Sequence, residues 1–372
     1  MLRAMNSPGT AYSVDPDIAV AATLDHRFYR DPAAWELARE RVFARTWQWI
    51  GDLGATREAE SLTPRDLLPG VLDEPLLLAR DSLGDLRCLS NVCTHRGNIL
   101  VNEACKAGQI RCGYHSRRFD LTGRMTFMPE FADAKNFPRP EDNLRQVPFG
   151  VWAGHGFASV HPAAMLEAVL VDMNERIDWM PVASFRHDAS RDRDFDVEAH
   201  WALYVENYLE GFHIPFVHAG LNAVVDYGTY ASELFAHSNL QLALAKEGEP
   251  AFDLPASSPD AGKRVAAYYW WIFPNLMLNF YPWGLSLNLV QPLAMDRTRV
   301  SFRSYVWDES KLDAGAGNGL DRVEMEDEAV VQAVQRGVRS RFYPGGRYSP
   351  TREMGVHHFH RLLCHYLLRD DA

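Results

Sequence analysis

The longest uncharged stretch of the chain, residues 265–295, contains no Asp, Glu, Lys or Arg. Three prolines, a glycine and several amide and hydroxyl side chains interrupt it, and aromatic residues are frequent. This pattern favours consecutive buried strands over a membrane span, which needs about 20 predominantly apolar residues in a row. Residues 298–307 predict a further strand with one wet face, because Arg299, Ser301 and Arg303 alternate with apolar or small residues.

Helical patterns occur in several other segments, one of them a strand-to-helix region at residues 195–213. Residues 30–47 predict a helix in which Asp31 is the cap and Pro32 the first helical residue. Residues 163–180 predict a second helix, and residues 321–340 predict a long amphipathic one. We expect its apolar stripe at Val323, Ala329 or Val330, Ala333 or Val334, and Val338.

The remaining pattern predicts an α+β fold. Residues 48–162 carry short strand-like runs broken by Gly, Pro and Asn, which indicates an all-β domain. Residues 163–372 are expected to form a second domain, an antiparallel sheet flanked by helices, and residues 1–47 a helical segment that packs on it. Residues 245–263 and 308–320, rich in Gly, Ala, Asp and Pro, are predicted loops.

The net charge and the cysteines restrict the kinds of partner and the compartment that we expect. The net charge of −11 over 372 residues disfavours nucleic acid as a partner. The five cysteines are odd in number and irregularly spaced, which disfavours a disulfide framework. The N-terminal residues show no apolar region of a secretory signal. We therefore expect a cytoplasmic protein that binds neither nucleic acid nor membrane.

Two short, near-matching pieces each pair one cysteine with one histidine: Cys93 with His95, and Cys112 with His115. Structural zinc sites usually place two cysteines together in one piece. A Rieske [2Fe–2S] cluster instead needs two thiolates on one iron and two imidazoles on the other. Each piece then gives its cysteine to one iron and its histidine to the other. The spacing predicts such a cluster, with a zinc knuckle as the alternative.

A second group of candidate ligands lies in the stretch ENYLEGFHIPFVH. Asn207, Glu210 and His213 are three residues apart and should form one stripe on a helix. His218 lies about 140° further round a regular helix, and we expect Pro215 to break that helix and let the two imidazoles face each other. Two imidazoles and a carboxylate can bind Fe(II) with open positions. The alternative is a structural histidine pair.

Together the two motifs resemble those of the Rieske non-haem iron oxygenases, the catalytic alpha subunits of the aromatic-ring-hydroxylating dioxygenase family. CTHRG followed by CGYH resembles the cluster motif, and Asn-x-x-Glu-x-x-His-x4-His resembles the mononuclear-iron motif. The resemblance implies that His213 and His218 bind the iron. It places Asp327 as the third ligand within Glu-Asp-x7-Gln-x-Gly, with Glu326 and Glu328 as competitors and a solvated acidic face as the alternative.

The second cluster piece departs from the family pattern. The family commonly reads Cys-Pro-x-His-Gly-Trp there, and this chain reads Cys-Gly-Tyr-His-Ser-Arg over residues 112–117. No ligand is lost, but packing around a cluster tunes its potential. Respiratory Rieske proteins carry two further cysteines, at positions that correspond to Asn98 and Gly113 here. That branch is therefore disfavoured.

The resemblance also implies roles beyond the ligands. Glu210 corresponds to the carboxylate that links the two metal sites, along a path from His115 of the partner subunit to His213, and this implies a ring-shaped homotrimer. Asn207 belongs to the same catalytic motif. NAD(P)H would deliver electrons through a separate flavin and iron–sulfur reductase or a ferredoxin. Six basic residues are expected to form its docking face, with a scattered solvated surface as the alternative: Arg96, Lys106, Arg111, Arg117, Arg118 and Arg124.

The C-terminal stretch VQRGVRSRFYPGGRYSPTREMGVHHFHRLL resembles the choline, glycine betaine and carnitine monooxygenase branch. The resemblance implies an all-β Rieske domain plus a helix-grip (START-like) catalytic domain. Its mononuclear Fe(II) would activate O2 and hydroxylate a small organic substrate, with N-demethylation or C–N cleavage of a quaternary ammonium or N-methyl compound. Aromatic-ring hydroxylation, a pure electron-transfer protein and a zinc scaffold are the alternatives.

An aromatic pocket would suit a methylated ammonium, because ring faces attract cations. It would equally hold a flat ring. Half of the candidate side chains must point away if the segment is a strand. The candidates are Tyr268, Tyr269, Trp270, Trp271, Phe273, Tyr281 and Trp283. Three further histidines, His357, His358 and His360, are expected in an interface or the core.

Overall fold

The computed structural model describes residues 12–368. The chain divides into two compact units. The β-rich unit comprises Phe43–Ala168 and Val182–Ser184, and the large unit comprises the chain up to Val42, Val169–Pro181 and the chain from Phe185 onward.

The β-rich unit contains three small antiparallel sheets. The first has the order β1–β10–β9, with bounds Gln48–Asp52, His155–Ala158 and Phe149–Trp152. The second has the order β4–β3–β2–β5, with bounds Leu86–Ser90, Glu74–Arg80, Ser61–Leu67 and Cys105–Lys106. The third has the order β6–β7–β8, with bounds Ile110–Arg111, Arg118–Phe119 and Met125–Phe127.

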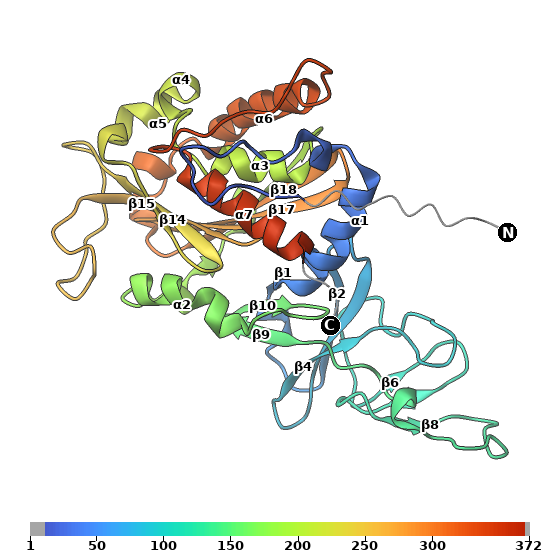
Figure 1. The fold of residues 1–372 in the computed structure, drawn as a ribbon. Helices are drawn as coiled ribbons and strands as arrows, with labels where there is room; N and C mark the ends of the chain where they lie inside the picture. The colour runs from blue at the N-terminus through green and yellow to red at the C-terminus, as the bar shows by residue number, and fades with distance from the viewer. Residues whose placement is uncertain (1–11, 369–372) are drawn as a thin grey trace, which may run out of the picture. The chain divides into compact units, whose positions relative to one another are not determined.

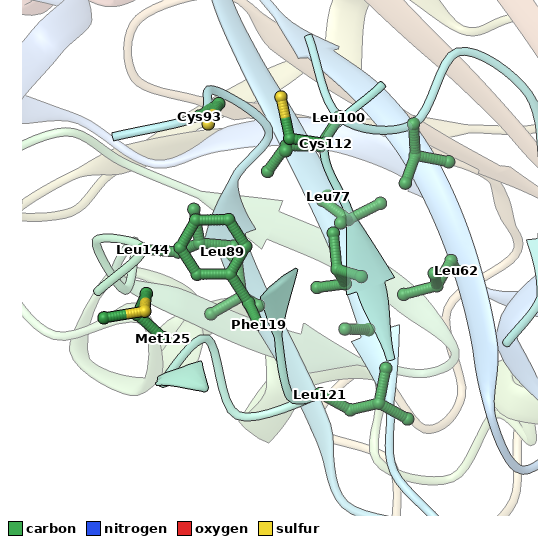
Figure 2. Packing of buried hydrophobic residues seen from close by; sticks show 13 residues of the cluster. Leu62, Leu77, Leu89, Cys93, Leu100, Cys112, Phe119, Leu121, Met125 and Leu144 are labelled. Carbon is green, nitrogen blue, oxygen red and sulfur yellow. The ribbon is translucent and has the colours of Figure 1, made fainter. Parts of the chain in front are cut away.

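One hydrophobic cluster lies between the second and third sheets of this unit. Leu77 and Leu89 from the second sheet pack with Phe119 from the third. Cys93 and Cys112 belong to the same cluster, and Figure 2 shows both at one end of it. The core therefore anchors the two loops that carry the predicted cluster ligands.

The large unit is built on one antiparallel sheet of eight strands. Its order is β11–β18–β17–β16–β15–β14–β13, and β12 also pairs with β18. The predicted run of buried strands is confirmed, since every residue of β15 (Val265–Ile272) and β16 (Leu276–Tyr281) is buried. The other strands are β11 Arg186–His187, β12 Arg193–Val197, β13 Ala231–Leu234, β14 Ser238–Leu244, β17 Gly284–Ala294 and β18 Arg297–Val306.

The solvent-exposed face predicted for β18 is present only in part. Arg299 and Arg303 are partly exposed and pair with acidic residues of β12. Ser301 is buried and donates to Asp194 Oδ1 at 2.5 Å. In the described part of the chain, no helix is long and apolar enough to cross a membrane.

Helices pack against this sheet. The seven α-helices of the described residues are α1 Pro32–Arg41, α2 Leu166–Ile177, α3 Trp201–Tyr208, α4 Ile214–Val217, α5 Ala219–Val224, α6 Leu320–Gly337 and α7 Met354–Leu368. Asp31 caps α1 as predicted, accepting from the Ala33 N–H at 2.9 Å. Figure 1 shows α3 close to α6, α7 and β17, with which it is in contact. On α7, His357 and His360 are buried, as expected for core residues.

The buried face of α6 is not the predicted one. Ala329, Ala333 and Val334 are exposed, and of the expected stripe only Val338 is fully buried. The buried residues within the helix are Glu324, Val331 and Gln335. The prediction is wrong because two of these three side chains are polar and make hydrogen bonds to α3 and its N-cap. A pattern of apolar residues cannot reveal such a face.

Candidate metal centres

Three side chains of the large unit bring their metal-binding atoms together. The Nε2 atoms of His213 and His218 lie 3.1 Å apart. Asp327 Oδ1 lies 3.0 Å from His218 Nε2 and 3.5 Å from His213 Nε2. The ligand atoms of these three residues all lie within 4.8 Å of one another, so they could hold one metal ion together. Among the described residues, no other group of three or more His, Cys, Asp or Glu side chains meets this criterion. Two imidazoles and one carboxylate on one side of an ion leave positions open, which suits non-haem Fe(II).

The backbone reaches this arrangement by a route that differs from the predicted one. Helix α3 ends at Tyr208, so Glu210 and His213 lie beyond it and do not form a stripe on one helix. His213 is the N-cap of α4, and Pro215 lies in the first turn of that helix. The prediction that Pro215 breaks a helix is therefore wrong, because proline is well tolerated at a helix start. The predicted meeting of His213 with His218 does occur.

A glycine permits the turn between α3 and α4. A Cβ on Gly211 would lie 2.6 Å from a ring carbon of Tyr230, closer than real Cβ contacts. Only a residue without a side chain therefore lets the chain pass the tyrosine here. The sequence motif records this glycine, but not the ring against which it packs.

A carboxylate holds each imidazole from the side opposite the candidate metal position. Glu210 Oε1 lies 2.6 Å from His213 Nδ1, and Glu326 Oε2 lies 2.8 Å from His218 Nδ1. These contacts place the ring proton on Nδ1 and leave Nε2 free to bind a metal. Burial acts to lower the pKa of His218, but the hydrogen bonds and charges of Asp327 and Glu326 outweigh it and raise that pKa. Glu326 thus supports a histidine and does not join the three-residue group.

Helices α3 and α6 are joined through the motif residues themselves. Asn207 Nδ2 donates to Asp327 Oδ1 at 2.6 Å. Gln335 Oε1 accepts from the backbone N–H of His200, the N-cap of α3, at 2.8 Å. Both α6 partners, Asp327 and Gln335, belong to the Glu-Asp-x7-Gln-x-Gly pattern. The role of Gln335 was not predicted, although its place in that pattern was the available signal.

In the β-rich unit, the two cysteine–histidine pieces fold into equivalent loops. In each loop the cysteine N–H donates to the carbonyl five residues later, and the N–H four residues later donates back to the cysteine carbonyl. These distances are 2.8 and 2.9 Å in the loop of Cys93, and 2.8 and 3.1 Å in the loop of Cys112. The fourth residue after each cysteine has a left-handed backbone, with φ of 70° at Gly97 and 61° at Ser116.

The four predicted cluster residues are arranged as a two-iron cluster requires. The rings of His95 and His115 are 4.7 Å apart and inclined at 74°. The Nδ1 atom of His115 is buried without a hydrogen-bond partner among the described residues, an arrangement that metal ligation would explain. Burial acts to raise the pKa of the Cys112 thiol, but hydrogen bonds from the backbone N–H groups of Tyr114 and His115 contribute to lowering it. The donor set and its two matched loops fit a Rieske cluster.

Arg117, at the position where the family commonly has tryptophan, is only 1 % exposed. Its Nη2 donates to Asp142 Oδ1 at 2.9 Å, and its Nη1 donates to Thr94 Oγ1 at 2.7 Å. The prediction that it belongs to a docking face is therefore wrong. The other members of the predicted set are exposed or partly exposed: Arg96, Lys106, Arg111, Arg118 and Arg124.

A cavity of about 100 Å³ in the large unit is lined by His213, His218 and Asp327. Of the seven predicted aromatic residues, Tyr269 and Tyr281 line it, and the other five do not. No pattern in the sequence indicated the four further aromatic residues of the lining, which are Tyr204, Tyr208, Tyr230 and Phe302. They come from α3, from the segment before β13, and from β18.

Comparison with known proteins decides the family. Residues 178–368, more than half of the chain, match the family profile described as ring hydroxylating alpha subunit (catalytic domain). This chain belongs to the ring-hydroxylating alpha-subunit family. Residues 55–138 match the Rieske [2Fe–2S] domain. The predicted family, iron-dependent oxygenase class and two cofactors, a [2Fe–2S] cluster and a mononuclear iron, are confirmed.

Relatives in the same family span nearly the whole chain. The chloroplastic choline monooxygenase of Arabidopsis thaliana is 30% identical, over 95% of this chain and 85% of its own length. The carnitine monooxygenase oxygenase subunit of Escherichia coli (strain K12) is 28% identical, over 92% and 93%. The alpha subunit is thus similar to enzymes of the predicted branch.

Solved structures confirm the α+β fold. The quaternary ammonium Rieske monooxygenase CntA in complex with L-carnitine has a TM-score of 0.73 at 23% identity, covering 93% of this chain and 96% of its own. Naphthalene 1,2-dioxygenase from Rhodococcus sp., bound to indole, has a TM-score of 0.73 at 20% identity, covering 93% and 94%. At these identities the likeness establishes the fold of this alpha subunit alone.

Proposed function

We propose that this alpha subunit is the oxygenase component of a multicomponent Rieske system that hydroxylates a quaternary ammonium compound. The observation that carries the proposal is the cavity beside His213, His218 and Asp327, which is walled by tyrosine rings. Ring faces attract methylated ammonium groups. The choline and carnitine monooxygenases among the relatives support the same substrate class.

Each metal is assigned to particular side chains. Cys93 and Cys112 hold one iron of the cluster, and His95 and His115 hold the other. His213, His218 and Asp327 hold the mononuclear Fe(II), which supplies O2 activation when bound.

The surrounding residues prepare the mononuclear site. Glu210 and Glu326 keep the ring protons of the two histidines on Nδ1. Asn207 fixes the orientation of Asp327 by donating to its Oδ1 atom. The tyrosine-lined walls hold the methylated group and exclude water.

The reaction balances with two electrons. One substrate C–H bond and one O2 give a C–OH group and one water, consuming two electrons and two protons. NAD(P)H supplies the electrons through a separate flavin and iron–sulfur reductase or a ferredoxin. Arg96 lies within the loop of Cys93, and Arg111 directly precedes Cys112. Both side chains are exposed, and they form the docking face for an acidic donor. A hydroxylated carbon bonded to nitrogen then releases a demethylated or cleaved product.

We further propose that the working form is a homotrimer in the cytoplasm. Glu210 links His115 of the partner subunit to His213 in that assembly. Large apolar side chains are exposed beside both ends of this path: Tyr114 is 58 % exposed next to His115, and Phe216 is 79 % exposed close to His213. A partner subunit that covers these two side chains would remove their apolar surface from water. None of the five cysteines, all of them among the described residues, forms a disulfide, which suits a reducing compartment.

The decisive experiment measures metal content and then turnover. Anaerobically purified protein should contain about three irons per chain and give a Rieske-type EPR signal after dithionite reduction. Turnover with a reductase is then followed with choline, carnitine and glycine betaine, and with naphthalene and indole. Oxidation of a quaternary ammonium supports the proposal. Oxidation of the rings alone would establish the second candidate, aromatic-ring hydroxylation, whose fold this chain shares.

A further inference from the structure

Glu324 has no cationic partner although its side chain is buried in the cavity wall. The residue is 2 % exposed. Its Oε2 accepts from Tyr204 O–H at 2.5 Å, while its Oε1 is buried without any hydrogen-bond partner in the described chain. The pKa of Glu324 is raised to about 8. Burial is the largest cause, and the negative charges of Asp327 and Glu328 raise the pKa further. A buried carboxyl oxygen that has neither a hydrogen-bond partner nor a positive charge beside it costs free energy. A ligand in the cavity can supply the missing partner.

Gln241 presents a second unsatisfied acceptor to the same cavity. Its Nε2 donates to the Tyr208 carbonyl at 2.6 Å, and because a carbonyl can only accept, this contact fixes which end of the amide is which. Gln241 Oε1 is then left buried without a partner. Among the described buried polar atoms that lack partners, these two oxygens are the ones on residues that line the cavity. Gln241 Oε1 accepts. The raised pKa of Glu324 favours its protonated form in the unliganded site, and a positive charge beside it would stabilise the carboxylate, which accepts. The ligand that complements both oxygens in this form carries a positive charge and a hydrogen-bond donor.

The charges of the lining point to the same ligand. Glu210, Glu324 and Asp327 are acidic, and none of the described residues around the cavity is lysine or arginine. A substrate carboxylate therefore finds no side-chain cation to pair with in this lining. With Fe(II) bound, the charge of Asp327 would be compensated, so Glu210 and Glu324 are the acidic groups that a substrate carboxylate would meet. A quaternary ammonium donates no hydrogen bond, so its compensation must come from a carboxylate and from ring faces. Tyr269 and Tyr281 offer such faces, with their rings 5.9 Å apart and inclined at 80°.

We propose that Glu324 and Gln241 select a quaternary ammonium alcohol over a carboxylate-bearing betaine, Glu324 facing the ammonium and Gln241 Oε1 accepting from the hydroxyl. This inference rests on the proposed function, and it narrows the substrate to choline-like amino alcohols. Neither residue is a candidate metal ligand. Their role is to set specificity through charge and hydrogen bonding at a site next to the iron.

Binding to the iron-loaded enzyme, without reductant and without O2, tests the proposal directly. Isothermal titration calorimetry compares choline, tetramethylammonium, L-carnitine, glycine betaine and the neutral choline analogue 3,3-dimethylbutan-1-ol. In the wild type, choline should bind at least about tenfold more tightly than carnitine, betaine and the neutral analogue. Carnitine or betaine binding as tightly as choline would overturn the proposal, and this comparison needs no variant.

Two variants assign the selection to particular residues. Glu324→Gln should bring choline to within about threefold of its neutral analogue. Asp321→Asn makes the same charge change at an exposed position of α6 and should leave the ranking unchanged. Gln241→Leu should weaken choline but not tetramethylammonium, which has no hydroxyl group. An unchanged choline preference in Glu324→Gln, with wild-type iron content, would contradict the assignment.

The outcomes also separate this inference from the function on which it rests. If carnitine binds best and is oxidised, the quaternary ammonium function stands and the selection by Glu324 fails. If none of the ammonium compounds binds and an aromatic ring is oxidised, both fail.

Discussion

Glu326 Oε2 lies 2.8 Å from Nδ1 of His218, on the side of the ring opposite the Nε2 atom that faces Asp327. Glu326 and Asp327 are neighbours in the chain, yet they contact the two different nitrogens of one imidazole. Consecutive helix residues point about 100° apart, so one acidic pair on α6 can hold the ring from both sides. The two carboxylates therefore have different tasks, and sequence alone could only list them as competitors.

Replacing Glu326 should weaken iron binding at the mononuclear site. In Glu326→Gln the negative charge that holds the Nδ1 proton of His218 is lost, so the imidazole is a poorer ligand. We expect the affinity for Fe(II) to fall by about 10–100-fold. Competition with a chelator, followed by iron analysis, measures it. Glu328→Gln on the same helix is the matched control. The EPR signal of the cluster should stay unchanged, and an unaltered iron affinity in Glu326→Gln would refute this role.

Replacing Glu210 should slow electron transfer even when both metals are bound. The amide oxygen introduced by Glu210→Gln can still accept from His213, and saturating Fe(II) offsets a loss of iron affinity of the kind expected for Glu326→Gln. The loss of the carboxylate should slow turnover by about 10–100-fold, because the bridge that we propose between the two metal sites loses its charge. Stopped-flow reoxidation of the reduced cluster measures this step. Glu326→Gln, which alters the partner of His218, is the control. Its reduced cluster should be reoxidised at the wild-type rate once the rate is corrected for the iron bound at the mononuclear site. Near-normal reoxidation in Glu210→Gln would show that electrons take another path.

The sequence predicted most reliably those features that depend on local pattern. The buried strands β15 and β16 follow from an unbroken apolar run, and the cluster loops follow from the spacing of Cys93 and Cys112. Features set by distant partners were missed. Arg117 is buried because Asp142, 25 residues later, neutralises it. The inward face of α6 is polar because Glu324 and Gln335 find partners on or beside α3.

The departure from the family motif at Ser116 should cost stability. Ser116 has φ of 61°, a left-handed backbone that costs a residue with a Cβ about 1 kcal/mol relative to glycine. Ser116→Gly should therefore stabilise the β-rich unit by about 0.5–1 kcal/mol, the hydrogen bond from Arg111 to the exposed Ser116 hydroxyl offsetting part of the gain. Thermal unfolding followed by the visible absorption of the cluster measures the change.

The equivalent position in the first loop provides the reciprocal test. Gly97 has φ of 70°, and an added Cβ would meet nothing within 4 Å. Gly97→Ser should thus destabilise the unit by about 1 kcal/mol through the backbone alone. Unchanged EPR parameters in both variants would show that the four ligands are undisturbed. If the two variants changed the unfolding free energy in the same direction, the backbone explanation would be contradicted.

A buried ion pair should make the large unit sensitive to acid. The Asp260 side chain is fully buried, and it accepts from Arg176 Nε at 2.6 Å and from Lys263 Nζ at 2.8 Å. Burial acts to raise the pKa of Asp260, but the hydrogen bonds from Lys263 and Arg176 outweigh it and lower that pKa. Asp260→Asn leaves the partly buried Arg176 with Glu233 as its remaining charged partner, and should cost about 1.5–3 kcal/mol of unfolding free energy at neutral pH.

The pH dependence of this loss follows from the lowered pKa. A carboxyl group with a lowered native pKa contributes its full stability above the unfolded-state value of about 3.9 and loses it as the pH falls through the native value. The gap between wild type and Asp260→Asn in urea unfolding should therefore be constant from about pH 5 to 8 and shrink below about pH 4. The metals are lost at low pH from the wild type and from Asp260→Asn alike, so this loss cancels when the two unfolding free energies are subtracted. Glu233→Gln, which removes the more exposed partner of Arg176, should cost less than about 1 kcal/mol. A gap that widened as the pH fell would mean that the Asp260 carboxylate does not stabilise the fold.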